Sequence, residues 1–174
     1  MNIEKDAFTV ETLKKLKNPG LLLVSTNKAG KSNVMTIGWG LIGTFWRMPM
    51  FVIAVRPSRY THRFIEQSKE FTVNVPADGM DKIVETCGTV SGRKIDKIRE
   101  CNITLKKAKE IRTPTIRQCK IHYECQVVHK LEINPKEVPR DIAKELYSRP
   151  DYHTLYFGKI LAVYRSTIQP KHMS

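Results

Sequence analysis

The chain has 174 residues, of which 41% are hydrophobic and 27% charged, a composition typical of a globular protein that builds its own core. No stretch approaches the roughly 18 uninterrupted apolar residues of a membrane span, and the start MNIEKDAFTVETLKKL lacks the apolar segment of an export signal, so we expect one cytoplasmic domain, residues 1–174, without membrane contact. Thirty Lys and Arg against 17 Asp and Glu give a formal charge of +13, which favours anionic ligands or partners.

The first part of the chain predicts a helix followed by a β-hairpin. Residues 4–17 carry acids first and lysines last, which complements a helix dipole, and Asn18-Pro19-Gly20 ends the helix. LLLVST and VMTIGW within residues 21–39 read as two strands joined by a loop at 27–32. The glycines that follow mark either a bend or a close approach of a ligand, and glycine alone leaves both alternatives open. These glycines are Gly38, Gly40 and Gly43.

A strand and a helix are predicted next, on either side of a basic turn. MFVIAV at 50–55 is rich in β-branched and aromatic residues and predicts a strand. RFIEQSKE predicts a helix, with Ser58 or Thr61 available as its N-cap.

FTVNV at 71–75 predicts another strand, and DGMDKIVETCG at 78–88 predicts a helix that ends at Gly88 as C-cap. The polar segment 91–102 predicts a loop with a short helical turn.

The last third predicts one long β segment over 115–133, a helix over 139–147 with proline at its start, and a final strand over 152–166. Strands dominate and do not alternate regularly with helices. This order favours an antiparallel barrel with helical connections over a parallel, doubly wound sheet.

The four cysteines do not indicate a metal site or a catalytic nucleophile. In an extended strand Cys119 and Cys125 lie about 20 Å apart with His122 on the opposite face, too far for one metal ion with ligands near 2.3 Å. We therefore expect no metal site and no disulfide framework. Cys87 is the one thiol in a polar, basic setting; it is either functional or a packed cysteine at a helix end.

RPSRYTHR, at residues 56–63, predicts an anion site. It lies where a strand passes into a helix, whose first N–H groups have no partners inside the helix and attract phosphate. Serine, threonine and arginine side chains add donors. The alternative is a capped surface helix with solvated arginines.

Two further segments favour a ligand. VSGRKIDK combines glycine, a hydroxyl and Lys97, which can contact the same anion. NVMTIGW places Asn33 and Thr36 on a glycine-containing strand beside Met35 and Trp39, which suits a flat heteroaromatic ring.

Together these segments resemble the flavin reductase-like, FMN-binding split-barrel family, in particular its flavoredoxin-like branch. The resemblance covers residues 17–165 and rests on PGLLLVST, NVMTIGW, RPSRYTHRFIEQ with FTVNVP, CGTVSGRKIDK and YHTLYFGKILAVY, in that order.

The resemblance implies a mainly β fold, a six-stranded antiparallel Greek-key split β-barrel that forms a homodimer with FMN near the subunit interface. It implies an FMN-dependent oxidoreductase that passes electrons from NADH or NADPH to an acceptor, or a flavoredoxin-type electron carrier without such activity. No catalytic side chain is implied. Arg56 lies before the turn and Arg63 lies one helical turn into the helix, so we expect both outside the site. The implied FMN-binding residues are Asn33, Met35, Thr36, Ile37 and Trp39 at the ring, Ser58, Arg59 and Thr61 at the phosphate, with Ser91, Gly92, Lys97 and His153 nearby.

A module that binds RNA or DNA is a further hypothesis, based on the charge of +13. The basic residues are spread along the chain, and the aromatic content of 8% forms no aromatic and basic stripe on which bases stack. We therefore expect no nucleic-acid partner.

Overall fold

A computed structural model describes residues 3–166. Its elements run in chain order as α1 (Ile3–Lys17), β1 (Leu21–Thr26), β2 (Ser32–Ile37), β3 (Gly40–Phe45), β4 (Met48–Val55), α2 (Tyr60–Ser68), β5 (Glu70–Pro76), α3 (Asp81–Thr89), α4 (Lys97–Glu100), β6 (Leu105–Lys106), β7 (Thr115–Ile116), β8 (Cys119–Glu132), the 3₁₀ turn η1 (Pro135–Glu137), α5 (Arg140–Leu146) and β9 (Thr154–Arg165).

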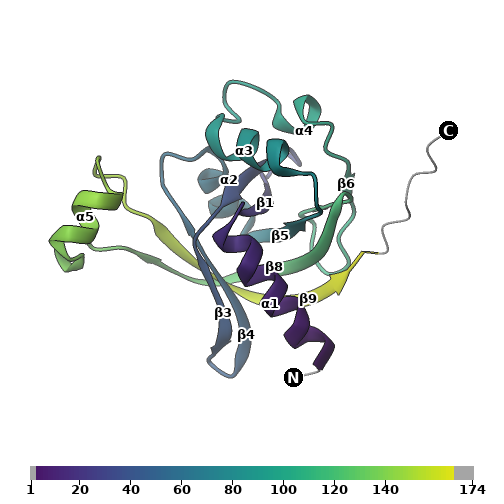
Figure 1. Ribbon diagram of the computed structural model, residues 1–174, viewed down its shortest axis with the longest axis horizontal. Helices are drawn as coiled ribbons and strands as arrows, with labels where there is room; N and C mark the ends of the chain where they lie inside the picture. The colour runs from purple at the N-terminus through teal and green to yellow at the C-terminus, as the bar shows by residue number, and fades with distance from the viewer. Residues whose placement is uncertain (1–2, 167–174) are drawn as a thin grey trace.

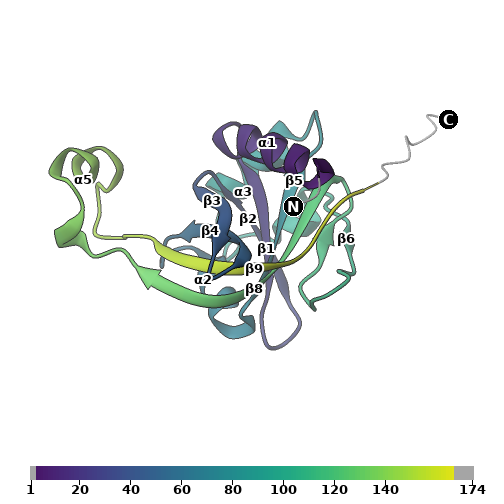
Figure 2. The same cartoon turned by 90° about the horizontal axis from the view of Figure 1, so that it is seen from below.

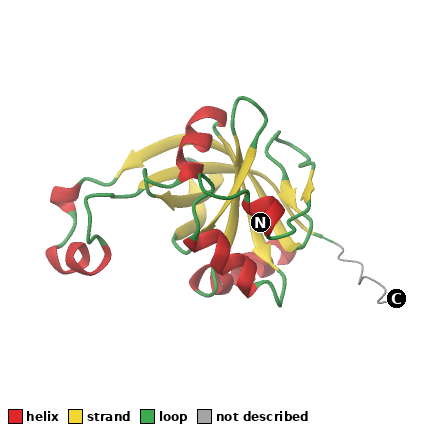
Figure 3. Cartoon of the chain, turned by 90° about the horizontal axis from the view of Figure 1, so that it is seen from above, coloured by secondary structure: helices red, strands yellow, loops and turns green. Residues whose placement is uncertain are grey.

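The main sheet is antiparallel and has the strand order β2-β1-β5-β8-β9-β4-β3, and β6 pairs with β7 in a small second sheet (Figure 1). Figure 3 shows the main sheet as a strongly curved layer with helices against it, while α5 stands away from the body at the end of two long strands. The predicted mainly β, antiparallel architecture is therefore confirmed.

The strand count differs from the predicted six, because the main sheet has seven strands. The addition is β3, an exposed edge strand with glycines at both Gly40 and Gly43, which carries no alternating apolar pattern. Within residues 3–166, the ladders leave β2 and β3 as the two edges of the sheet.

β1 pairs with β2, the strand that carries Asn33 and Met35, and both faces of β1 are buried. Leu21 and Leu23 pack into one core with strands of the barrel-like sheet, while Leu22 and Val24 pack into a second core with α3. Burial on both faces explains why LLLVST is an unbroken apolar run rather than an alternating one.

The ends of β8 and β9 project from the body as a two-stranded arm that carries α5 (Figures 1 and 2). Several apolar side chains of this arm are exposed, because an arm of two strands has little structure around it to cover them. Those more than a third exposed are Val128, Leu131, Ile142 and Leu146.

Three local expectations are wrong for tertiary reasons. The N-cap of α2 is Arg59, without a side-chain capping bond, because Ser58 and Thr61 bond to residues elsewhere in the fold. Gly88 does not end α3, which continues to Thr89; a Cβ at Gly88 would lie only 3.3 Å from Cβ of Thr36. The predicted β segment 115–133 divides into β7 and β8.

His122 is a hydrogen-bonded core histidine. Its Nδ1 lies 2.9 Å from Oδ1 of Asn74 and its Nε2 lies 2.7 Å from Oγ of Ser166. Burial lowers its pKa to about 4, and the charges of Lys106 and Lys109 act in the same direction, against Glu124. Both ring nitrogens are used within the protein.

Because the pKa of His122 is lowered, we expect the protein to lose stability in mild acid. Between pH 6.5 and 4 the unfolded chain binds a proton that the folded chain does not, so the free energy of unfolding should fall by roughly 1–3 kcal/mol as the pH falls through this window. Urea unfolding from pH 7 to pH 4 should show a weaker pH dependence for His122→Gln than for His129→Gln, a control in the projecting arm. Equal slopes for both variants would contradict this assignment.

Within the described part of the chain, no helix is both long enough and apolar enough to cross a membrane.

Candidate functional site

Two adjoining cavities follow β2, and every predicted site residue lines at least one of them. We name them after the parts of the ligand that the sequence analysis expects there: the phosphate-end cavity, of about 380 Å³, and the ring-end cavity, of about 170 Å³. They share Met35, Arg56 and Arg59. The structure thus brings together segments far apart in the sequence. The phosphate-end cavity is lined by Asn33, Met35, Ser58, Arg59, Thr61, Ser91, Gly92 and Lys97, and the ring-end cavity by Met35, Thr36, Ile37, Trp39, Arg59 and His153.

Lys97 places a buried positive charge in the wall of the phosphate-end cavity. Its side chain belongs to a residue only 3% exposed, and its Nζ donates to the backbone oxygen of Cys87 at 3.0 Å. Burial lowers the pKa of Lys97, and the nearby charge of Arg59 lowers it further. Among the side chains that the structure describes, those of residues 8–166, no carboxylate lies within 4.0 Å of this ammonium group. A buried ammonium without a carboxylate partner favours an anionic ligand.

Arg59 lies at the N-terminus of α2, between the two cavities. Its Nη1 donates to the backbone oxygen of Gly88 at 3.0 Å, which draws the guanidinium across to the end of α3. The N–H groups of the first turn of α2 have no partners inside the helix, and this end of the helix carries the positive end of the helix dipole. Arg59, Lys97 and this helix end therefore create a positive potential in one small volume.

Arg56 corrects the sequence analysis, which placed it outside the site. It lines both cavities, donates from Nη2 to the backbone oxygen of Leu146 at 2.8 Å, and stacks over the ring of Tyr147 at 5.0 Å. Arg56 thereby ties the projecting arm to the site. Arg63, by contrast, lies 4.5 Å over the Tyr60 ring and lines neither cavity, as predicted.

Ser58 is held by an acidic residue that the sequence analysis missed. Both its amide N–H and its hydroxyl donate to the carboxylate of Asp151, the N–H at 3.2 Å. Asp151 is one carboxylate among three cationic side chains in the phosphate-end cavity. In this arrangement the Ser58 hydroxyl donates to Asp151 rather than into the cavity.

Asn33, Thr61 and Gly92 form a tightly packed corner. Nδ2 of Asn33 donates to Oγ1 of Thr61 at 2.6 Å, and both side chains are buried. A Cβ at Gly92 would lie 2.1 Å from Oδ1 of Asn33, so only glycine lets the loop lie directly against this amide. β2 and α2 are thus locked together beside the cavity.

The ring-end cavity is bordered by aromatic side chains. The rings of Trp39 and His153 have centroids 4.6 Å apart, and the Tyr147 hydroxyl lies 2.9 Å from Nδ1 of His153. Burial and then the charge of Arg56 lower the pKa of His153 to about 4, so its ring is neutral at pH 7. Thr36 donates its hydroxyl to the backbone oxygen of Val84 at 2.5 Å, which directs it toward α3.

Cys87 is a packed cysteine that also lines the phosphate-end cavity. It is 1% exposed, and burial raises the pKa of its thiol to about 12. The thiol is therefore neutral at pH 7, which argues against a role as nucleophile.

Arg56, Tyr60 and Asp151 line the phosphate-end cavity but were left out of the predicted site, and they differ in whether a local pattern pointed to them. Arg56 and Tyr60 stand inside the RPSRYTHR segment and line the phosphate-end cavity, so the segment itself was the signal. Asp151 had none, since its contact with Ser58 joins residues 93 positions apart.

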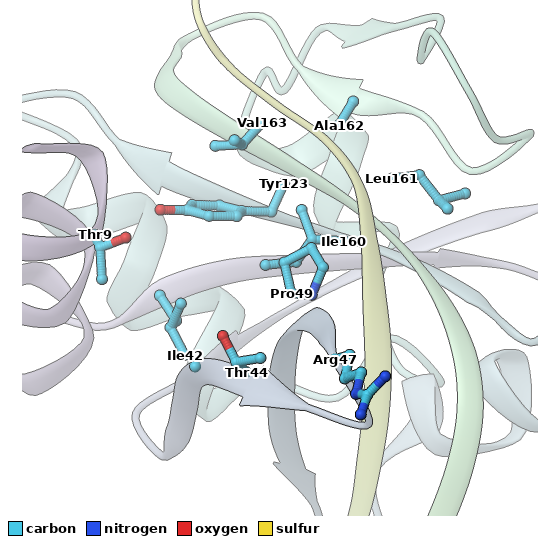
Figure 4. A pocket seen from close by; sticks show the side chains of 11 residues that line it. Thr9, Ile42, Thr44, Arg47, Pro49, Tyr123, Ile160, Leu161, Ala162 and Val163 are labelled. Carbon is cyan, nitrogen blue, oxygen red and sulfur yellow. The ribbon is translucent and has the colours of Figure 1, made fainter. Parts of the chain in front are cut away.

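Another cavity, of about 430 Å³, lies between α1, the β3-β4 hairpin and β9 (Figure 4). It is mostly apolar, and the ring of Tyr123 extends across it toward α1, where the hydroxyl lies 2.9 Å from Oγ1 of Thr12. None of the predicted site residues lines this cavity.

Comparisons with known proteins give relatives of this chain in sequence and in fold. An uncharacterized protein of Archaeoglobus fulgidus is 33% identical over 133 residues, which is 76% of this chain but 65%, or less than two thirds, of that protein. A flavoredoxin structure from Methanosarcina acetivorans is 32% identical with a TM-score of 0.68, covering 86% of this chain and 69% of the other.

A crystal structure of a putative flavin reductase with a split-barrel domain from Shewanella frigidimarina shows the same fold. Its TM-score is 0.70 at 14% identity, covering 97% of this chain and 76% of that one. The family described as flavin reductase like domain matches residues 17–172, nearly the whole chain. The chain therefore belongs to the flavin reductase-like family.

Proposed function

We propose that this chain binds FMN along β2 and acts as an FMN-dependent oxidoreductase. The observation that carries the proposal is the buried Lys97, which converges with Arg59 and the first turn of α2 on one cavity. That cavity suits a phosphate, and the adjoining cavity between Trp39 and His153 suits a flat ring.

The predicted residues divide between the two parts of the ligand. In the proposal, the buried strand residues of β2 and the aromatic pair border the ring, while the α2 turn and the 91–97 loop surround the phosphate. Bound FMN supplies the redox chemistry, accepting a hydride from a reduced nicotinamide and passing electrons to an acceptor. His153 is neutral at pH 7 and serves to position rather than to carry charge.

The second candidate is a flavoredoxin-type electron carrier that holds FMN without reacting with NADH or NADPH. The similarity to the Methanosarcina acetivorans flavoredoxin favours it. Both candidates require FMN in the same two cavities and differ only in the electron donor.

Visible spectroscopy and rapid mixing test both candidates. Purified protein, or protein supplied with FMN, should absorb near 450 nm, roughly where oxidised flavin absorbs, and FMN should raise its melting temperature. Loss of this absorbance on mixing with NADH or NADPH identifies the reductase, and loss with dithionite alone leaves the carrier. Protein that neither absorbs nor gains stability from FMN would contradict both.

In the same proposal the protein is a homodimer. The support is the projecting arm, whose exposed Val128, Leu131, Ile142 and Leu146 have apolar area that a second copy can bury. Light scattering on the sample used for spectroscopy should give twice the chain mass of 20.1 kDa. A mass of one chain would contradict the dimer.

A further inference from the structure

The carboxylate of Asp151 lies at the N-terminus of α2, in the wall of the phosphate-end cavity. One of its oxygens accepts from the amide N–H of Ser58 at 3.2 Å, and the other accepts from the Ser58 hydroxyl. Ser58 directly precedes Arg59, the N-cap of α2. An N–H group and a hydroxyl beside the positive end of a helix are donors that a phosphate uses. An anion of the chain itself therefore holds donors that the proposed function assigns to the phosphate of FMN.

The charges around Asp151 make it a competitor of a phosphate. Among the residues that the structure describes, Asp151 is the one carboxylate that lines this cavity, and the side chains described, those of residues 8–166, place no Lys, Arg or His nitrogen within 4.0 Å of it. Ser58, and not an ion pair, therefore holds the carboxylate. A phosphate beside it would bring a second anion into the same small volume, where like charges repel. The cations that line the cavity are Arg56, Arg59 and Lys97.

Asp151 belongs to the return segment, residues 147–152, which leads from α5 back towards β9. Figures 1 and 2 show α5 at the far end of the arm, away from the body of the protein. Arg56 joins the return segment to the site, donating to the backbone oxygens of Leu146 at 2.8 Å and of Asp151 at 3.3 Å. A phosphate that attracts Arg56 and displaces the Asp151 carboxylate would remove both attachments.

We propose that Asp151 is an internal competitor for the phosphate position. A phosphate that binds at the N-terminus of α2 displaces the Asp151 carboxylate from Ser58, and the return segment then separates from the site. The inference rests on the proposed function, because it requires the phosphate of FMN to lie in the phosphate-end cavity. Displacement of the carboxylate lowers the affinity of the site for anions, and it transmits occupancy of the cavity to the projecting arm.

Titration with FMN tests the competition in the variant Asp151→Asn, which removes the charge and keeps the size of the side chain. The variant should bind FMN about 5- to 20-fold more tightly than the unsubstituted chain, because the phosphate no longer displaces a charged group. The matched control is Glu145→Gln, which removes one negative charge from an exposed position of the same arm that lines neither cavity. Its FMN affinity should stay within about twofold.

Hydrogen exchange read by mass spectrometry tests the displacement itself, since repulsion without displacement would also give a gain in affinity. In the unsubstituted chain, saturation with FMN should speed exchange in 147–152 by about threefold or more while slowing it in the turn at 56–63. In Asp151→Asn the return segment should exchange fast without FMN and respond little to it. Saturating inorganic phosphate should speed exchange in 147–152 as well, because the phosphate alone displaces the carboxylate.

Three results would each overturn the inference. They are weaker FMN binding by Asp151→Asn, equal changes of affinity in Asp151→Asn and Glu145→Gln, and unchanged or slower exchange in 147–152 when FMN binds. Slower exchange would mean that Asp151 stays on Ser58 and orders the site around the ligand. If FMN binds neither the unsubstituted chain nor Asp151→Asn, the proposed function fails; if FMN binds and the return segment does not exchange faster, only the inference on Asp151 fails.

Discussion

Arg59→Ala should weaken FMN binding by about 10- to 150-fold, the loss expected when a charged hydrogen bond of about 1.5–3 kcal/mol to phosphate is removed. Arg59 lines both cavities and lies at the N-terminus of α2, where its charge adds to that of the helix end and of Lys97. Fluorescence titration of FMN measures the change. Ser58→Ala should have a smaller effect, because the Ser58 hydroxyl donates to Asp151.

Arg63→Ala is the matched control for this substitution. It removes the same charge from the same helix, but Arg63 lies over Tyr60 and lines neither cavity. Its FMN affinity should stay within about threefold, since exposed charges at this range are largely screened. Equal losses for Arg59→Ala and Arg63→Ala would place the phosphate elsewhere.

Gly158→Ala should destabilise the fold by about 1–3 kcal/mol through overpacking. Gly158 lies in β9 opposite Phe51 of β4, and a Cβ there would come within 2.3 Å of Cζ of Phe71 and 2.9 Å of Cβ of Cys125. Both neighbours are fully buried, so neither can move without disturbing the core. Urea unfolding should show a lower midpoint with an unchanged slope.

Gly43→Ala tests whether this loss comes from contact rather than from glycine in a strand. Gly43 lies in β3, and no atom lies within 4 Å of its added Cβ. Its free energy of unfolding should change by less than about 0.5 kcal/mol. Phe71→Leu, which removes the closest atoms, should recover part of the loss when combined with Gly158→Ala. A loss at Gly43 equal to that at Gly158, or no coupling to Phe71, would contradict overpacking.

Most of the elements could be predicted because their patterns are local. The hairpin around 27–31, the strands at 50–55 and 71–75, the helix near 140–146 and the final strand all appear where apolar runs and turn residues indicate. β3 was missed because two glycines interrupt an exposed edge strand that has no apolar alternation, although Ile42, Thr44 and Phe45 favour strands.

The candidate site was predicted as a set of segments, but its internal contacts were not. Ser58 and Thr61 are typical capping residues, and neither caps α2, because Asp151 and Asn33 bond to them instead. Arg56 lies before the turn in the sequence, yet its side chain lines both cavities and contacts the backbone of Leu146 in the distant arm. No local pattern carries information about partners 28 to 95 residues away.

The amino-acid sequence by itself determined the β-rich antiparallel class, the position of the basic turn at 56–63 and the glycine-containing strand that lies beside it. These depend on side-chain alternation, helix ends and turn chemistry, which act over a few residues. Only the tertiary structure decided that Lys97 is buried with its ammonium group against the last turns of α3, that Asp151 holds Ser58, and that two adjoining cavities follow β2. Burial and the choice of hydrogen-bond partner depend on which segments the folded chain brings together, and these segments lie far apart in the sequence.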